Sequence, residues 1–163
     1  MLKLHSLPAP LKWHQPDVFL STGFGSGLIR PASGTWGSLL CFALLLPLWP
    51  DLPTETKCGL AILFSLIGLT ILQYLTQRLK RTLDDSSWIV IDEWAGLAIA
   101  LIPSSDPLYM IGSFLLFRLF DIWKPFPISW VDKHVKGSSG IMIDDLIAGA
   151  IAALLIIGIQ ALV

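Results

Sequence analysis

Two long apolar runs constrain the fold of this chain more than any other feature of its sequence. Residues 59–75 and residues 146–163 contain no charged side chain, and each approaches the about 20 residues that a helix needs to cross a bilayer. Three shorter apolar stretches cover residues 38–49, 88–102 and 107–120, and none of the five shows the sustained alternation of a strand. The sequence therefore predicts an all-α fold, a polytopic membrane bundle of about four to five hydrophobic helices with loops on the cytoplasmic side.

The composition agrees with a membrane protein and excludes other classes. Hydrophobic residues make up 54% of the chain and charged residues 14%, whereas soluble domains carry about 25% charged residues. A net charge of −1 leaves no basic surface for a nucleic acid, and Cys41 and Cys58 are too few for a disulfide framework or a zinc site. The length indicates one domain over residues 1–163, with residues 1–20 as a flexible or amphipathic N-terminal segment.

Basic residues are distributed unevenly among the loops between the apolar stretches. If Arg118 is counted with the loop that follows it, every one of the 11 Lys and Arg residues except Lys57 lies on alternate connections. Because cytoplasmic loops of membrane proteins carry an excess of Lys and Arg, we expect these connections, and the N-terminus, to lie in the cytoplasm.

This topology gathers acidic side chains at one depth of the membrane. Asp92 and Glu93 lie in the first turns of the third apolar stretch, Asp121 directly follows the fourth, and Asp144 and Asp145 immediately precede the fifth. Each acid alone is also explained by a neighbouring base or by the wet interface, and a helix start favours Asp144 and Asp145 by its dipole alone. Five acids in one layer are better explained by a polar site facing the interior of the bundle.

Spacing within the stretches predicts two further relations. Arg118 and Asp121 are three residues apart and share one face of a helix. Gly96 follows Asp92 by four residues, so it permits a second helix to approach closely on that face.

The residue types in this layer limit its chemistry. His5, His14 and His134 do not have the spacing of metal ligands, and an oxygen-rich site favours a hard cation, Mg²⁺ before Mn²⁺ or Ca²⁺. Arg118 and Lys124 are candidates for binding a phosphate. The alternative for both is charge balance or snorkelling towards lipid headgroups.

A loop rich in Gly, Ser and Thr, residues 23–37, precedes the first apolar stretch. Backbone amides in such a loop, followed by a helix start, can cradle an anion, which makes Gly25, Ser26, Gly27 and Thr35 candidates for substrate binding. The loop lacks the Gly-Lys-Ser/Thr ending of a P-loop, and a flexible entry into the membrane is the alternative interpretation.

Three blocks of the sequence carry a resemblance to a known family. They are residues 23–37 (GFGSGLIRPASGTWG), residues 90–96 (VIDEWAG) and residues 117–127 (FRLFDIWKPFP), the last continuing through Asp132 to residues 140–149 (GIMIDDLIAG). Together they resemble phosphatidylglycerophosphatase A, a bacterial inner-membrane lipid phosphatase. The resemblance implies Mg²⁺-dependent hydrolysis of phosphatidylglycerophosphate to phosphatidylglycerol and phosphate, with membrane lipids as partners and no nucleic acid.

The resemblance also implies a location and a set of roles. The chain would be a multi-pass protein of the bacterial inner (cytoplasmic) membrane with its active site facing the cytoplasm. For the mechanism, the sequence leaves two attacking groups open, a metal-activated water or an aspartate that forms a phospho-enzyme. The catalytic candidates are Asp92, Glu93, Asp121, Asp144 and Asp145, the metal ligands Asp92, Glu93, Asp121 and Asp145, and the substrate-binding candidates Gly25, Ser26, Gly27, Thr35, Arg118, Lys124 and Asp132.

A small ion-coupled transporter or channel subunit is the competing class of function. Its intramembrane acids would form an ion path and would be spread through the depth of the membrane. This sequence instead places its acids at one end of the predicted helices.

Overall fold

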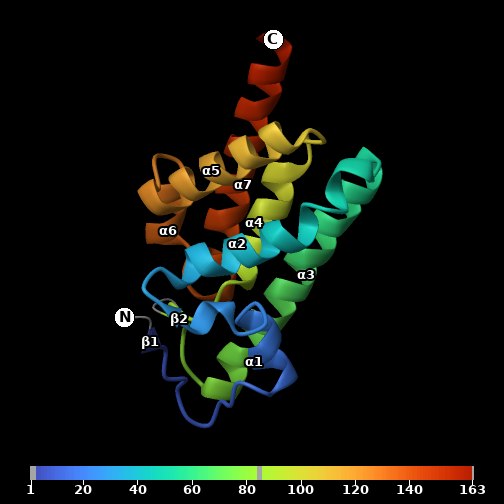
Figure 1. The fold of residues 1–163 in the computed structure, drawn as a ribbon. Helices are drawn as coiled ribbons and strands as arrows, with labels where there is room; N and C mark the ends of the chain where they lie inside the picture. Colours follow the sequence, from blue (N-terminus) through green and yellow to red (C-terminus); the bar gives the residue numbers. More distant parts are fainter. Residues whose placement is uncertain (1–2, 84–85, 163) are drawn as a thin grey trace.

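The structure, a computed structural model, describes residues 3–83 and 86–162 and consists almost entirely of helices (Figure 1). This confirms the predicted helical bundle. Two short antiparallel strands, β1 (Lys3–Leu4) and β2 (Ile29–Arg30), join the N-terminal segment to the loop before the second helix. The helices are α1 (Pro16–Ser21), α2 (Ser33–Leu45), α3 (Thr54–Leu79), α4 (Ile91–Leu101), α5 (Pro107–Trp123), α6 (Ile128–His134) and α7 (Gly137–Leu162), with 3-10 turns η1 (Ser26–Leu28) and η2 (Trp49–Asp51).

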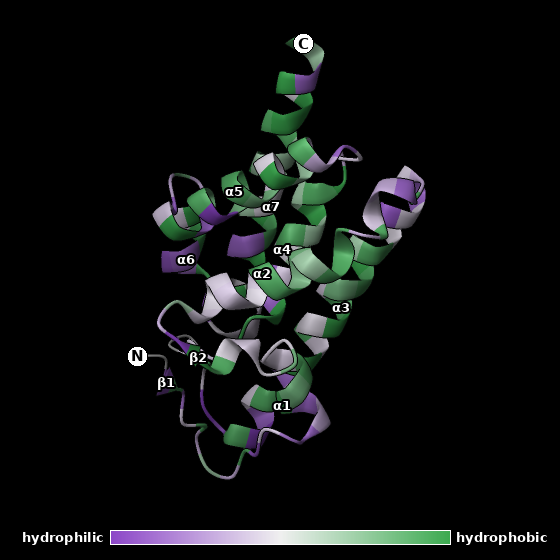
Figure 2. Ribbon diagram, in the orientation of Figure 1, coloured by the Kyte–Doolittle hydropathy of each residue, from purple (hydrophilic) through white to green (hydrophobic). Residues whose placement is uncertain are grey.

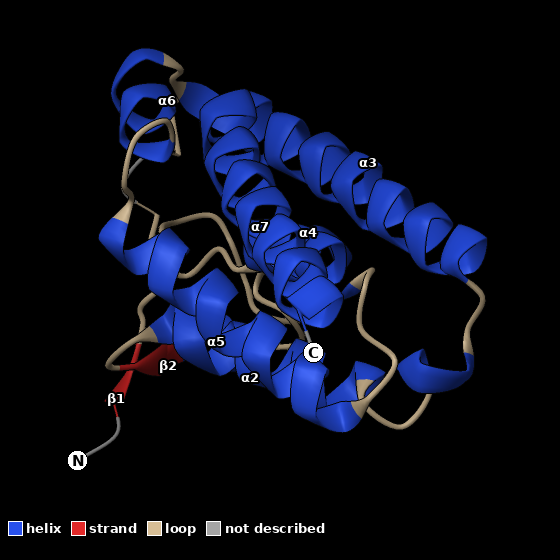
Figure 3. Cartoon of the chain, turned by 90° about the horizontal axis from the view of Figure 1, so that it is seen from above, coloured by secondary structure: helices blue, strands red, loops and turns tan. Residues whose placement is uncertain are grey.

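The short helix α4 lies at the centre of the bundle and contacts α2, α3, α5 and α7 (Figure 3). Leu97, Ala98 and Leu101 on this helix are fully buried. Its closest neighbour is α7, where a Cβ on Gly96 would lie 2.5 Å from the backbone oxygen of Asp145. The predicted close approach at Gly96 is therefore confirmed, and the partner is the acidic part of α7.

Two of the described helices, α3 and α7, are long and apolar enough to cross a membrane, with 26 residues each. Much of α3 is hydrophobic (Figure 2), and its large apolar side chains Ile62, Leu63 and Leu66 are exposed. The helix α2 is apolar but has only 13 residues. The crossing of the membrane by these helices, long or short, stays a prediction.

The predicted boundary of the last helix is wrong. We expected the helix to begin after Asp145, but α7 begins at Gly137, so Asp144 and Asp145 lie inside it, two turns from its start. The added turns hold Gly and Ser residues, which favour loops on propensity alone. Here Ser138 is buried and its hydroxyl lies 2.9 Å from that of Thr76 on α3, so tertiary contact extends the helix.

The third apolar stretch also differs from the helix it contains. Residues 88–90 are outside α4, and the backbone N–H of Val90 donates to the carbonyl of Ser21 at the end of α1. Helix α4 therefore starts at Ile91, which puts Asp92 and Glu93 in its first turn, as predicted.

Candidate active site

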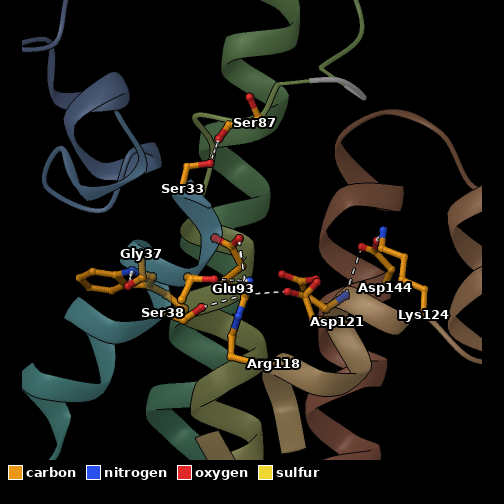
Figure 4. Close-up of polar contacts among 12 residues, drawn as sticks. Ser33, Gly37, Ser38, Ser87, Glu93, Arg118, Asp121, Lys124 and Asp144 are labelled. Carbon is orange, nitrogen blue, oxygen red and sulfur yellow. Dashed lines mark hydrogen bonds and ion pairs between the residues drawn. The ribbon is translucent and has the colours of Figure 1, made fainter. Parts of the chain in front are cut away.

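A cavity of about 510 Å³ opens beside the first turn of α4 and is bounded by α5, α6 and α7. Side chains that are far apart in the sequence meet there, as the acidic layer predicted. Figure 4 shows several of them, with Glu93 and Asp121 both close to the guanidinium of Arg118. The charged side chains that line the cavity are Asp92, Glu93, Asp121, Lys124, Asp132, Lys136, Asp144 and Asp145.

Several carboxylates of this pocket are buried and incompletely hydrogen-bonded. Glu93, Asp144 and Asp145 are less than one tenth exposed. Among the described residues, the buried side-chain atoms without a hydrogen-bond partner are Asp92 Oδ1, Glu93 Oε2, Asp145 Oδ2 and Arg118 Nε. Each unsatisfied buried polar group costs about 1–3 kcal/mol, so a fold that keeps them together here favours a function for them.

Arg118 lies behind the carboxylates rather than on the wall of the cavity. Its Nη1 lies 2.5 Å from Asp121 Oδ2 and 3.7 Å from Glu93 Oε1, so the predicted pairing with Asp121 on one helix face is confirmed. The same guanidinium donates to the hydroxyls of Ser38 (3.1 Å) and Thr35 (3.4 Å) on α2. Arg118 therefore fixes two carboxylates and neutralises part of their charge.

The sequence analysis did not identify three α2 residues that lie near this ion pair. Ser38 receives the hydrogen bond from Arg118, and the Ser33 hydroxyl donates to the carbonyl of Ser87 at the rim of the cavity. Gly34 packs so closely that a Cβ there would collide with the Glu93 carboxylate. Ser38 could have been found, because it follows Thr35 by three residues on one helix face. No local pattern indicates the role of Gly34.

Lys124 closes the other side of the cavity. It follows the end of α5 with a left-handed backbone conformation, and its Nζ lies 2.5 Å from Asp132 Oδ1 and 2.6 Å from Asp144 Oδ2. Partial burial opposes the charged form, but the hydrogen bonds to the two carboxylates outweigh it and raise the pKa of Lys124. The same hydrogen bond lowers the pKa of Asp132. The lysine therefore stays charged and links α5, α6 and α7.

The glycine loop does not reach the acidic cavity. Gly25 and Ser26 line a separate apolar groove, and Gly27 packs against the carbonyl of Trp88. The reason is local, because residues 26–28 form η1 and the Ser26 hydroxyl donates back to the carbonyl of Gly23 at 2.7 Å. Of the loop candidates, Thr35 alone contacts a charged side chain of the site, through Arg118.

The donor set of the cavity suits a hard divalent cation. The acids Asp92, Glu93, Asp121, Asp132, Asp144 and Asp145 line it together with two lysines, which leaves an excess of oxygen ligands. The unpartnered oxygens of Asp92, Glu93 and Asp145 are available to such an ion. Within the described residues, no three Asp, Glu, His or Cys side chains are already clustered tightly enough to hold one.

The chain is similar to known proteins over most of its length. Residues 19–160 match the family model described as phosphatidylglycerophosphatase A. The chain is 40% identical over 147 residues to phosphatidylglycerophosphatase A of Escherichia coli K12, which covers 88% of this chain and 83% of the relative. The identity to the Haemophilus influenzae protein of the same name is also 40% over 147 residues, covering 89% of each.

A third relative carries a different name. The chain is 36% identical over 148 residues to a Bacteroides thetaiotaomicron protein named "Putative phosphatidylinositol-3-phosphatase", covering 85% of this chain and 90% of that protein. No solved structure matches the chain. The family model and the first two relatives show that the chain belongs to the phosphatidylglycerophosphatase A family, which confirms the resemblance carried by the three sequence blocks.

Proposed function

We propose that this protein hydrolyses the phosphate monoester of phosphatidylglycerophosphate, giving phosphatidylglycerol and inorganic phosphate, in a Mg²⁺-dependent step of phospholipid biosynthesis. One observation carries the proposal within this family. Carboxylates from α4, α5 and α7 surround a single cavity, and three of them keep a buried oxygen without a hydrogen-bond partner.

The charge balance of the cavity supports the dependence on a metal. A phosphate monoester is an anion, and the acids that line the cavity outnumber Lys124 and Lys136. Mg²⁺ bound there would offset the repulsion and stabilise charge that develops in the transition state. Asp92, Glu93, Asp121 and Asp145 would hold it, because they are the acids that lie nearest to the Arg118 side of the site or keep free oxygens.

The remaining charged residues have separate tasks in this proposal. Lys124 and Lys136 bind the phosphate oxygens from the open side of the cavity. Arg118 holds Glu93 and Asp121 in position from behind. In the reaction, an oxygen nucleophile attacks phosphorus, the bond from phosphorus to the glycerol oxygen breaks, and the glycerol oxygen takes up a proton. If water is the nucleophile, it gives up a proton and inorganic phosphate leaves directly. If an aspartate of the cavity is the nucleophile, it carries the phosphoryl group until water cleaves the acyl phosphate and releases inorganic phosphate.

The proposal places the cavity at the cytoplasmic face of the bacterial inner membrane in a multi-pass protein. The exposed apolar surface of α3 and the apolar second half of α7 support membrane insertion, and the alternate basic loops support the orientation. A transporter is not favoured, because the acidic groups that line the cavity gather at one end of α4 rather than along the depth of the bundle.

The test is release of phosphate by the purified full chain in detergent. We expect release from phosphatidylglycerophosphate with Mg²⁺, loss of at least about 100-fold in EDTA, and recovery when Mg²⁺ is added back. Phosphatidylinositol 3-phosphate serves as the second substrate, because one relative carries that name. Faster release from it than from phosphatidylglycerophosphate would reject the proposed headgroup, and full activity in EDTA would reject the metal.

A further inference from the structure

Helix α2 has two different faces at its N-terminal half. Gly34, Thr35 and Ser38 face the Glu93–Arg118 pair of the candidate active site. The opposite face borders a second cavity of about 510 Å³, which we call the apolar groove. Its lining is Phe24, Gly25, Ser26, Ile29, Trp36, Leu39, Leu40 and Ala43.

The walls of the apolar groove are held in place before anything binds. The indole N–H of Trp36 donates to the carbonyl of Pro31 at 3.0 Å. Phe24 meets the Trp94 ring edge-on with 5.3 Å between ring centroids, and the Trp94 indole N–H donates to the carbonyl of Gly37. A preformed apolar wall favours a ligand that fits it, because little side-chain entropy is lost on binding.

The same groove remains open to its surroundings. Phe24 is 45% exposed, Trp36 37% and Leu39 43%. Rings fixed by hydrogen bonds and by stacking, and yet exposed to this extent, are not filling a protein core.

The apolar groove and the acidic cavity lie on two sides of α2, although they have no lining residue in common. Thr35 contacts Arg118, and the next residue, Trp36, lines the groove. On α4, Glu93 lines the cavity, and the next residue, Trp94, supports the groove through Phe24. The start of α2, about 10 Å across with its side chains, and the Glu93–Arg118 pair that packs against it lie between the two.

We infer that the apolar groove holds an acyl chain of the lipid whose phosphate enters the acidic cavity. The inference rests on the proposed function and names how that site selects a lipid. A phospholipid joins an anionic headgroup to acyl chains within a few bonds, which matches a charged cavity and an apolar groove on two sides of one helix end. In a membrane, bulk lipid already solvates apolar chains, so the groove orients the substrate more than it adds affinity.

A substitution that fills the groove tests this directly. Ala43 lines the groove and is exposed, so Ala43→Trp blocks it without disturbing the core. Leu44→Trp is the matched control, because Leu44 lies next to it on α2, is 46% exposed and does not line the groove. Each variant is assayed on phosphatidylglycerophosphate with palmitoyl chains and with butanoyl chains.

The expected result is a change in chain-length preference. Ala43→Trp should lower kcat/KM for the palmitoyl substrate by roughly 10-fold, through misplacement of the headgroup, and leave the butanoyl substrate almost unchanged. Leu44→Trp should match the wild type on both. If the ratio of kcat/KM for the palmitoyl substrate to kcat/KM for the butanoyl substrate is the same in all three proteins, the inference is overturned and the proposed function stays intact.

A second measurement does not depend on turnover. Phosphatidylglycerophosphate with a diazirine near the start of one acyl chain should, on irradiation, label the peptide of residues 33–45 in the wild type and label it several-fold less in Ala43→Trp. A phosphatidylcholine probe with the same chain is the control for bulk lipid. Equal labelling of that peptide by both probes would overturn the inference, even if the protein releases no phosphate from either lipid.

Discussion

Charged side chains are buried at both ends of α4, but they have hydrogen-bond partners at one end and incomplete hydrogen bonding at the other. At the C-terminal end, Lys57 is 1% exposed, and its Nζ donates to the carbonyl of Ser104 at 3.1 Å and to the hydroxyl of Ser105 at 2.8 Å. The indole N–H of Trp49 donates to the carbonyl of Leu101 beside it. The buried polar groups at this end of α4 therefore have hydrogen-bond partners.

At the N-terminal end of α4, buried polar atoms lack hydrogen-bond partners. In the part of the chain that the structure describes, the buried side-chain atoms that lack a partner all belong to Asp92, Glu93, Arg118 and Asp145. A buried charge therefore has a different role at each end of α4. Lys57 has hydrogen-bond partners within the fold, whereas the acids at the other end keep buried oxygens without a partner, which favours a function for them.

Asp145→Asn gives the largest expected effect on function. Loss of one carboxylate from the proposed metal site should lower phosphate release by about 100- to 1,000-fold, the usual loss for one preorganised charged or donor group. Because Asp145 is buried among other acids, the melting temperature should stay the same or rise. Turnover close to that of the wild type would show that Asp145 is not part of the site. A large fall in melting temperature would show that its role is structural.

Gly34→Ala should damage the site from the side of α2. The added methyl group would collide with the Glu93 carboxylate, and a shift of about 1 Å at a catalytic group can cost about 100-fold in rate. Gly59→Ala is the control, because a Cβ there meets nothing within 4 Å on α3. The account fails here if Gly34→Ala keeps wild-type kcat/KM.

Lys57→Met should affect stability and not activity. Methionine keeps much of the apolar stem of the side chain but leaves the carbonyl of Ser104 without its buried donor, which costs about 1–3 kcal/mol. Thermal unfolding in detergent measures the change, and kcat should remain at the wild-type value. A drop in kcat as large as that of Asp145→Asn would abolish the distinction between the two ends of α4.

Asp132→Asn should give the smallest change in stability, and this change should depend on pH. The folded-state pKa of Asp132 is lowered by Lys124, so the charged pair stabilises the fold above the ordinary aspartate pKa, and this contribution is lost as the pH falls through the lowered pKa. Because the side chain is 45% exposed, the wild type should exceed the variant by less than about 1 kcal/mol at neutral pH. An equal difference at acidic pH would show that another contact is responsible.

The gathering of the acids could be predicted from the sequence because it follows from helix ends and charge. The apolar stretches place Asp92, Glu93 and Asp121 at helix termini, and the positive-inside rule puts those termini on one side. The start of α7 could not be predicted in this way. Its first turns, at Gly137 and Ser138, depend on contact with Thr76 of α3, and such contact overrides local propensity.

The roles that depend on tertiary packing were also beyond the sequence. Arg118 was expected to face a phosphate, but it lies behind Glu93 and Asp121 because α2 supplies it with two hydroxyl partners. Gly34 carries no signal of its own, since its importance comes from the distance between α2 and α4. Sequence pattern therefore located the acidic layer, while the depth and direction of each side chain came from packing.

The central claim is that carboxylates from α4, α5 and α7 hold one divalent cation site at the end of α4. The most direct test is a titration of the purified protein with Mn²⁺, in which electron paramagnetic resonance follows the free ion. We predict saturable binding that Mg²⁺ displaces and that Asp145→Asn weakens by at least about 10-fold, while Lys57→Met leaves it unchanged. The absence of saturable binding in the wild type, or unaltered binding in Asp145→Asn, would contradict the account.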